Sequence, residues 1–165
     1  MSIASHCVEN LKQVQTILEK LTNEQYARPL EILSNSSIGG HVRHILEFYI
    51  CLMRKDHTEI SYDKRDRNKR LEEDKSYCLQ MIPSIISTLE TYRADQELVL
   101  FSNFSETSDE VIELTTSLFR ELAYCLEHSV HHEAIIKIAI NSLCNEIDMI
   151  ETFGVAASTV RFNNN

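Results

Sequence analysis

The scarcity of glycine and proline limits what this chain can fold into more than any other feature. Three glycines and two prolines occur among 165 residues. Because these two residue types mark most turns, so few of them leave little room for the many short strands of an all-β fold. The hydrophobic fraction of 43% is ordinary for a globular protein, and the length suits one domain with its own core. We therefore expect a single all-α domain over residues 1–165.

Hydrophobic periodicity predicts four long helices, at residues 5–22, 36–55, 67–92 and 117–150, where apolar residues recur every three to four positions. Ser36 or Ser37 would cap the second helix. Pro83 would kink the third or remove one of its hydrogen bonds. Two β-prone runs, ELVLFSNF and EVIELTTS, precede the last helix and predict a small hairpin. The expected fold is a four-helix bundle with a long crossover.

The charge balance argues against nucleic acid as a partner. The formal net charge is −9, and an acidic surface repels phosphate backbones. The basic run DKRDRNKR, residues 63–70, contains two aspartates and no aromatic residue, so we expect a solvated helix start there.

Cysteine usage and hydropathy suggest a cytoplasmic protein. Five cysteines are scattered without a CxxC pair, which favours neither a disulfide framework nor a zinc ribbon. The first residues, MSIASHCVEN, lack the pattern of a signal peptide. No apolar run approaches the roughly 20 residues that span a bilayer, so we expect no membrane partner.

Three histidines interrupt the apolar pattern of the last helix, in CLEHSVHHEAIIKIAI. At about 100° per residue, His132 falls within the apolar face and His128 at its edge, whereas His131 falls well outside it. Side chains four residues apart on a helix lie about 6 Å apart at Cβ, so two imidazoles can converge on one cation. A third ligand would have to come from another helix.

His41 and His44, in SSIGGHVRHILEFY, are the candidates for that third ligand. The helical phase places His41 inside the apolar face and His44 at its margin, a slight preference for His41. The alternative is that each histidine is an ordinary core or boundary residue bonded to a carbonyl or carboxylate. A buried, unpaired imidazole costs about 1–3 kcal/mol, so several together favour a shared partner.

Other chemistries have less support in the sequence. The chain has no HExxH motif, and no histidine has a glutamate three residues before it, as a ferritin-like di-iron site would need. The HHE at 131–133 leaves a haemerythrin-like site conceivable, but Glu133 would point elsewhere. Cys125 could be a nucleophile beside His128, although its place on the buried face favours a role in the core.

The two histidine segments, SIGGHVRHILEFY and RELAYCLEHSVHHEAIIKI, resemble the DinB/YfiT-like superfamily of metal-dependent enzymes. The ending FGVAASTVRF is similar to the tail of one bacterial branch, so the resemblance covers most of the chain. It implies a four-helix bundle and a triad of metal ligands at His44, His128 and His132. His41, His131 and Glu47 would then hold those ligands in place. The chain lacks the tryptophan that many members carry near the second helix.

The resemblance also implies a divalent ion, zinc or nickel, with open positions for water or substrate. The expected function is a metal-dependent hydrolase or a low-molecular-weight-thiol S-transferase, with catalytic residues left unknown. The expected partners are a small-molecule substrate, a thiol cosubstrate and a second copy in a homodimer. Residues 61–67, with Arg43, Glu47 and Arg120, would line a pocket or orient the ligands; the alternative is that each forms a surface or interhelical salt bridge. The alternative function is a metal-binding or stress-associated bundle without catalysis.

Overall fold

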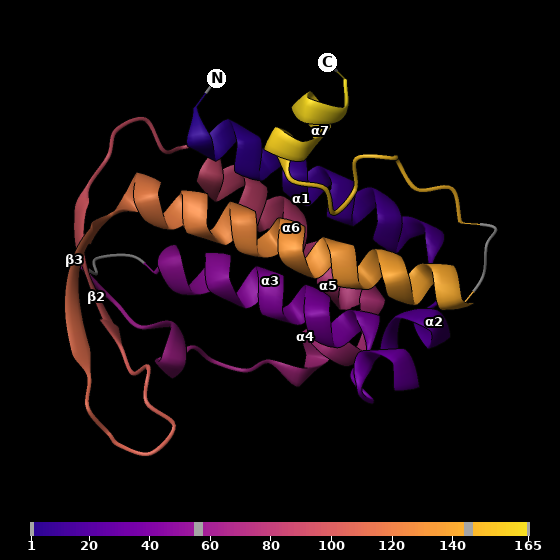
Figure 1. Cartoon of the computed structure of the whole chain (residues 1–165), viewed down its shortest axis with the longest axis horizontal. Helices are drawn as coiled ribbons and strands as arrows, with labels where there is room; N and C mark the ends of the chain where they lie inside the picture. The colour runs from indigo at the N-terminus through magenta and orange to yellow at the C-terminus, as the bar shows by residue number, and fades with distance from the viewer. Residues whose placement is uncertain (1, 55–57, 144–146, 165) are drawn as a thin grey trace.

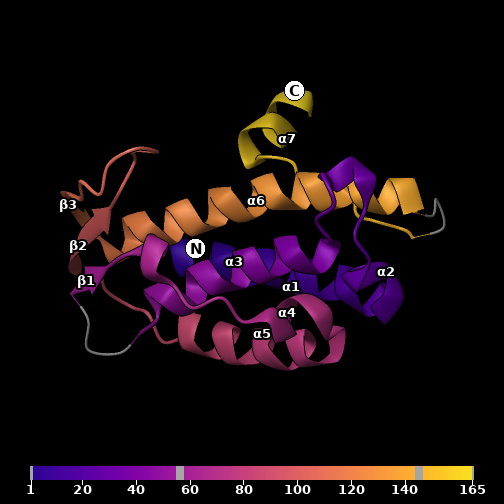
Figure 2. The same cartoon turned by 90° about the horizontal axis from the view of Figure 1, so that it is seen from below.

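The computed structural model describes residues 2–54, 58–143 and 147–164 of the chain, and within them the fold is mainly helical with one small sheet. Figures 1 and 2 show long helices lying side by side, with the sheet across one end. The helices are α1 (Ile3–Lys20), α2 (Asn23–Ala27), α3 (Ile38–Leu52), α4 (Lys69–Glu73), α5 (Lys75–Leu89), α6 (Leu118–Leu143) and α7 (Ala157–Asn163). Two 3₁₀ turns, Glu31–Leu33 and Tyr62–Lys64, connect some of them. The expected helical class is confirmed at this level.

Four long helices enclose the core. α6 packs on α3 and α1, and α5 packs on α1 and α3 (Figure 2). Each contributes one apolar face, as the periodicity predicts: Leu11 of α1, Val42 of α3, Ile82 of α5 and Leu122 of α6 are all fully buried. None of the helices in the described ranges combines the length and hydrophobicity needed to cross a membrane.

The small sheet contains the expected hairpin and one further strand. Strands β2 (Glu97–Ser102) and β3 (Ile112–Ser117) form the antiparallel pair that the two β-prone runs predict. A third strand, β1 (Glu59–Ile60), joins β2 in parallel and gives the order β1-β2-β3. β1 is two residues long, too short to show any alternation in the sequence, so the polar crossing that contains it gave no sign of it.

Two expected helices have different bounds. The third breaks at Asp74, whose extended backbone ends α4 and begins α5: its amide donates to the Arg70 carbonyl, and its carboxylate accepts from the Tyr77 amide. Pro83 lies inside α5 without ending it. The last helix, expected to reach residue 150, ends at Leu143, and residues 147–150 are not helical; residues 144–146 lie outside the described ranges.

The connection after α1 is more ordered than expected. Thr22 and Gln25 form a reciprocal capping box that starts α2, a signal present in the sequence that the breaker residues around Pro29 obscured. Ser37 caps α3, accepting from the Gly40 amide at 2.9 Å. Gly39 then lets α4 approach closely, because a Cβ there would lie 2.0 Å from the Glu72 carbonyl oxygen. This close contact fixes the first turn of α3, two residues before His41 and five before His44.

Candidate metal centre

Three histidines from two helices meet between α3 and α6. Nε2 of His44 lies 2.9 Å from Nε2 of His128, which lies 3.2 Å from Nε2 of His132. Within the described ranges, these are the only three histidine, cysteine or acidic side chains whose ligand atoms gather closely enough to hold an ion, all within 4.8 Å of one another. The structure therefore positions three histidines to hold a metal ion.

The spacing of the nitrogens fits a shared ion. Two nitrogens bound tetrahedrally at ~2.05 Å lie about 3.3 Å apart, and the angle of an octahedral site brings them to about 2.9 Å. The nitrogens of this centre lie at 2.9 and 3.2 Å. Two of the three nitrogen pairs thus have separations that fit a bound ion, and the third pair lies within 4.8 Å.

The surroundings keep these imidazoles neutral, the form that binds a metal. Burial lowers the pKa of His44 to about 4, with the neighbouring Arg65 adding to the effect. Burial also lowers the pKa of His132 to about 3, reinforced by His44 and His128. The pKa of His128 falls for the same reason, burial first.

The remaining histidines of the two segments lie in different places. Nδ1 of His41 is 2.9 Å from Nδ1 of His132, so His41 contacts the outer side of a candidate ligand. His131 is exposed, with its ring centre 5.4 Å from that of His132. Both His41 and His44 contact histidines of α6, so a helical phase measured against the core could not tell which of them meets the other two ligands.

An arginine of the 61–67 segment, Arg65, contacts the centre. Nη2 of Arg65 donates to Nδ1 of His44 at 3.1 Å, and Nε lies 3.6 Å from the carboxylate of Glu47. Glu47 is 3% exposed and also accepts from the Asn68 amide at 2.7 Å. It reaches the centre through Arg65 and not directly. Arg43 lies 3.7 Å from Glu47 and also pairs with Glu72.

The residues of the expected solvated helix start at 63–70 are exposed, with the exception of Arg65. The run begins as a 3₁₀ turn and an extended segment, and helix α4 starts only at Lys69. The side chain of Arg65 is 12% exposed. Its neighbours in the sequence are charged, so neither composition nor periodicity distinguishes it from residues that face solvent.

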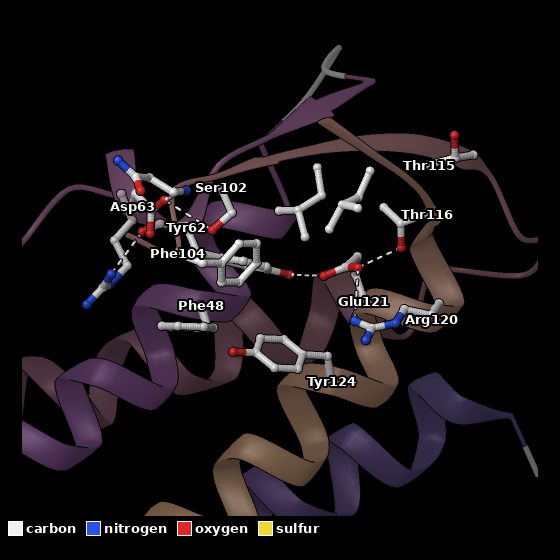
Figure 3. Close-up of a pocket in the computed structure, with 14 residues that line it drawn as sticks. Phe48, Tyr62, Asp63, Ser102, Phe104, Thr115, Thr116, Arg120, Glu121 and Tyr124 are labelled. Atoms are coloured by element: carbon white, nitrogen blue, oxygen red, sulfur yellow. Dashed lines mark hydrogen bonds and ion pairs between the residues drawn. The ribbon is translucent and has the colours of Figure 1, made fainter. Parts of the chain in front are cut away.

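A pocket of about 500 Å³ lies beside the centre, between α3, α6 and the sheet (Figure 3). Its lining combines six aromatic or aliphatic residues with eight polar ones, among them two arginines and two acidic residues: Phe48, Tyr62, Asp63, Arg65, Leu100, Ser102, Asn103, Phe104, Leu114, Thr115, Thr116, Arg120, Glu121 and Tyr124. Residues of the 61–67 segment and Arg120 thus line a pocket and also form ion pairs. Both of the expected roles are present.

The pocket and the histidine centre share a wall. The Phe48 ring lies 4.7 Å from the His44 ring and 4.6 Å from the His128 ring, measured between centres. On its other side it stacks on Tyr62 at 4.6 Å. Tyr124 stacks on His128 at 5.6 Å. A ligand in the pocket would therefore lie against the rings that pack on the candidate metal ligands.

A buried carboxylate fixes the inner end of the pocket. Glu121 is fully buried and accepts hydrogen bonds from the Tyr62 hydroxyl at 2.9 Å and from Thr116 Oγ1 at 2.6 Å (Figure 3). Arg120 Nη1 lies 3.2 Å from the same carboxylate. The carboxylate thereby ties β3 and the Tyr62 turn to α6.

Cys125 and Glu133 lie away from the centre, in positions that favour structural roles. Burial raises the pKa of the Cys125 thiol far above its usual value, which disfavours a reactive thiolate. Glu133 accepts from Asn10 at 2.6 Å and from the Gly154 amide at 3.2 Å. Its carboxylate thus joins α6 to α1 and to the segment after α6.

The chain is similar to part of a known protein. No family model and no solved structure matches the chain. A protein of Rhizopus delemar named FK506-binding protein 5 is 34% identical over 109 residues. The match covers 63% of this chain and 27% of that protein, so the chain spans about a quarter of the relative's length. The DinB/YfiT-like resemblance stays a prediction.

This relative corrects the expected function. Its name describes the binding of FK506, and neither hydrolysis nor thiol transfer, so the expectation of a metal-dependent hydrolase or S-transferase is wrong. The stress-associated alternative fails on the same finding. The preference for zinc or nickel is also corrected, because imidazole suits zinc, copper, iron and nickel alike and the donor set selects none of them.

Proposed function

We propose that this chain is a small-molecule-binding helical domain that holds a divalent transition-metal ion in the wall of its pocket. The observation that carries the proposal is the position of Phe48, which packs on His44 and His128 and also lines the pocket. His44, His128 and His132 would be the ligands. The arrangement of four long helices supports a bundle with a long crossover as the fold of this domain.

The residues around the pocket suit a ligand with a flat apolar part. The rings of Phe48, Tyr62 and Tyr124 line the pocket and can make aromatic contacts with a ligand, which contribute about 0.5–1.5 kcal/mol each beyond the area that they bury. Glu121 orients the Tyr62 hydroxyl from behind. When bound, the metal ion would supply a positive charge and open positions for an electron-pair donor of the ligand.

Calorimetric titration with Zn²⁺, Ni²⁺ and Co²⁺ tests the metal part of this proposal. We expect one ion per chain, and an affinity at least a hundredfold weaker in the His128→Ala variant, which removes the nitrogen next to both others. His6→Ala is the matched control, because His6 is an exposed histidine on α1. Equal affinity in the wild type and in His128→Ala would contradict the proposal.

A second candidate function is the binding of FK506 itself, favoured by the name of the partial relative and by the aromatic lining of the pocket. Titration with FK506 tests it directly. We expect binding by the wild type and weaker binding by Tyr124→Ser, since Tyr124 lines the pocket. Tyr92→Ser is the control, because Tyr92 does not line that pocket. Equal affinity of the two variants for FK506 would show that FK506 does not bind in this pocket.

A further inference from the structure

The contact between Arg65 and His44 defines the proton positions of the metal-free centre. A guanidinium has five N–H donors and no acceptor, so the bond from Nη2 of Arg65 requires Nδ1 of His44 to be the acceptor. The neutral ring then carries its proton on Nε2, the atom 2.9 Å from Nε2 of His128. In this state His44 donates to His128 through the nitrogen that would bind the ion.

A metal ion requires the opposite arrangement. An imidazole binds a metal through an unprotonated nitrogen, so an ion on Nε2 of His44 needs the ring proton on Nδ1. That N–H would face an N–H of Arg65, and two donors form no hydrogen bond with each other. The ion and the bond between Arg65 and His44 therefore exclude each other. Arg65 must release His44 when the ion binds.

The released guanidinium stays at the pocket. Arg65 Cζ lies 5.1 Å over the Phe48 ring, and Arg65 lines the same cavity. Its Nη1 donates to the Tyr62 carbonyl at 2.8 Å, and its Nε lies near Glu47, contacts that do not involve a histidine. These contacts hold the side chain while Nη2 loses its acceptor. Because an unpaired donor on a largely buried side chain is unfavourable, a new acceptor is needed.

We propose that metal binding releases Arg65 from His44 and converts it into an anion-binding group of the pocket. This inference rests on the proposed metal centre. The ligand class is a carboxylate, or a similar oxyanion, on a flat apolar body. The carboxylate matches the fork of a guanidinium, and the flat body matches the rings of Phe48, Tyr62 and Tyr124. Since coupling between two binding sites is reciprocal, such an anion should also tighten metal binding.

Benzoate is a suitable probe, with benzyl alcohol as its uncharged analogue. NMR titrations would measure the affinity of each with and without saturating Zn²⁺. In the wild type, zinc should tighten benzoate binding by about tenfold or more, the effect of one hydrogen bond to a charged group, and leave benzyl alcohol unchanged. Equal benzoate affinity with and without bound zinc would overturn the proposal.

Two arginine variants show whether Arg65 causes the gain in benzoate affinity. Arg65→Met should lose the gain for benzoate and should bind zinc about tenfold more tightly than the wild type, because no hydrogen bond has to break. Arg120→Met changes the other arginine of the pocket, whose side chain contacts Glu121 and Tyr124, and should keep the gain. A gain that persists in Arg65→Met would show that the anion binds the metal alone, and would overturn the role of Arg65.

The Arg65→Met variant also removes a partner of the buried Glu47 and could change the structure for that reason. The tautomer of His44 tests the proposal in the wild type, without any substitution. Nitrogen-15 NMR of the wild type should find the His44 proton on Nε2 without zinc and on Nδ1 with zinc. A proton on Nδ1 in the metal-free protein would overturn the proposal. If zinc does not bind the wild type at all, the proposed metal centre fails and the coupling fails with it. That result is distinct from zinc binding without coupling.

Discussion

Nδ1 of His41 lies 2.9 Å from Nδ1 of His132, on the side of the His132 ring that faces away from the candidate metal position. A histidine that binds a metal through one nitrogen commonly donates a hydrogen bond from the other, and that bond fixes the orientation of the ring. In the proposed centre, His132 would use Nε2 for the ion and donate from Nδ1 to His41. His41 would then support a ligand without being one.

Replacing His41 with alanine should therefore weaken metal binding without abolishing it. Loss of such a supporting partner typically costs about 10–100-fold in metal affinity. His131→Ala should leave the affinity unchanged, because that ring is exposed and its nitrogens do not bond to the centre in the structure. Calorimetric titration of the two variants measures the difference. A larger loss in His131→Ala than in His41→Ala would reverse the assigned roles.

Alanine should change the free energy of unfolding by different amounts at the two adjacent glycines near the start of α3. Gly39→Ala should lower the free energy of unfolding by about 2–4 kcal/mol, because its Cβ would meet the Glu72 backbone oxygen at 2.0 Å and the Tyr26 ring at 2.8 Å. In Gly40→Ala the nearest atom is the Ser36 hydroxyl, which can rotate away, so the gain in helix propensity should keep the change within about 1 kcal/mol. Urea unfolding measures both; equal effects would rule out the close approach of α4 as the reason for Gly39.

Glu133 should make the protein less stable as the pH rises. Burial raises its pKa to about 7 from the ordinary value of 4.5, despite hydrogen bonds from Asn10, Ser129 and Gly154. The folded chain therefore holds more protons than the unfolded chain between these values, so the contribution is present near pH 4.5 and is lost as the pH rises through about 7.

The isosteric variant Glu133→Gln isolates this contribution, since its side chain does not ionise. The free energy of unfolding of Glu133→Gln minus that of the wild type should be larger at pH 8 than at pH 5 by up to about 3 kcal/mol, because only the wild type loses stability over this range. Urea unfolding at the two pH values provides the comparison. A difference of the opposite sign would mean that the three hydrogen bonds outweigh the effect of burial.

The helical phase predicted which histidines of the last helix face inward, but it did not identify the ligand on the second helix. A single helix determines its own phase, so His128 and His132 could be placed on one side and His131 outside it. The choice between His41 and His44 depends on which neighbour each side of α3 meets, and a phase measured against the core does not contain that information. The preference for His44 came from the DinB/YfiT-like resemblance, in which the two histidine segments occur in the same order.

The contacts that sequence reasoning missed come from segments without a period. Arg65 reaches His44 from an extended stretch between a 3₁₀ turn and α4, and no repeat of apolar residues marks its direction. Strand β1 has only two residues, so it also lacks a repeat of apolar residues that would mark it in the sequence. The break at Asp74 could have been found, because an aspartate three residues before Tyr77 is a helix-capping pattern, but the apolar repeat runs through it. Function was the weakest inference, because it came from the resemblance and not from the residues.

The most direct test of the central claim is a crystal structure of the zinc-loaded protein with anomalous diffraction measured at the zinc edge. We expect one anomalous peak per chain between α3 and α6, with Nε2 of His44, His128 and His132 each at about 2.0–2.1 Å. A peak bound instead by His41, His131 or cysteine sulfurs would contradict the assigned ligands. The absence of any peak between the two helices would contradict the metal centre itself.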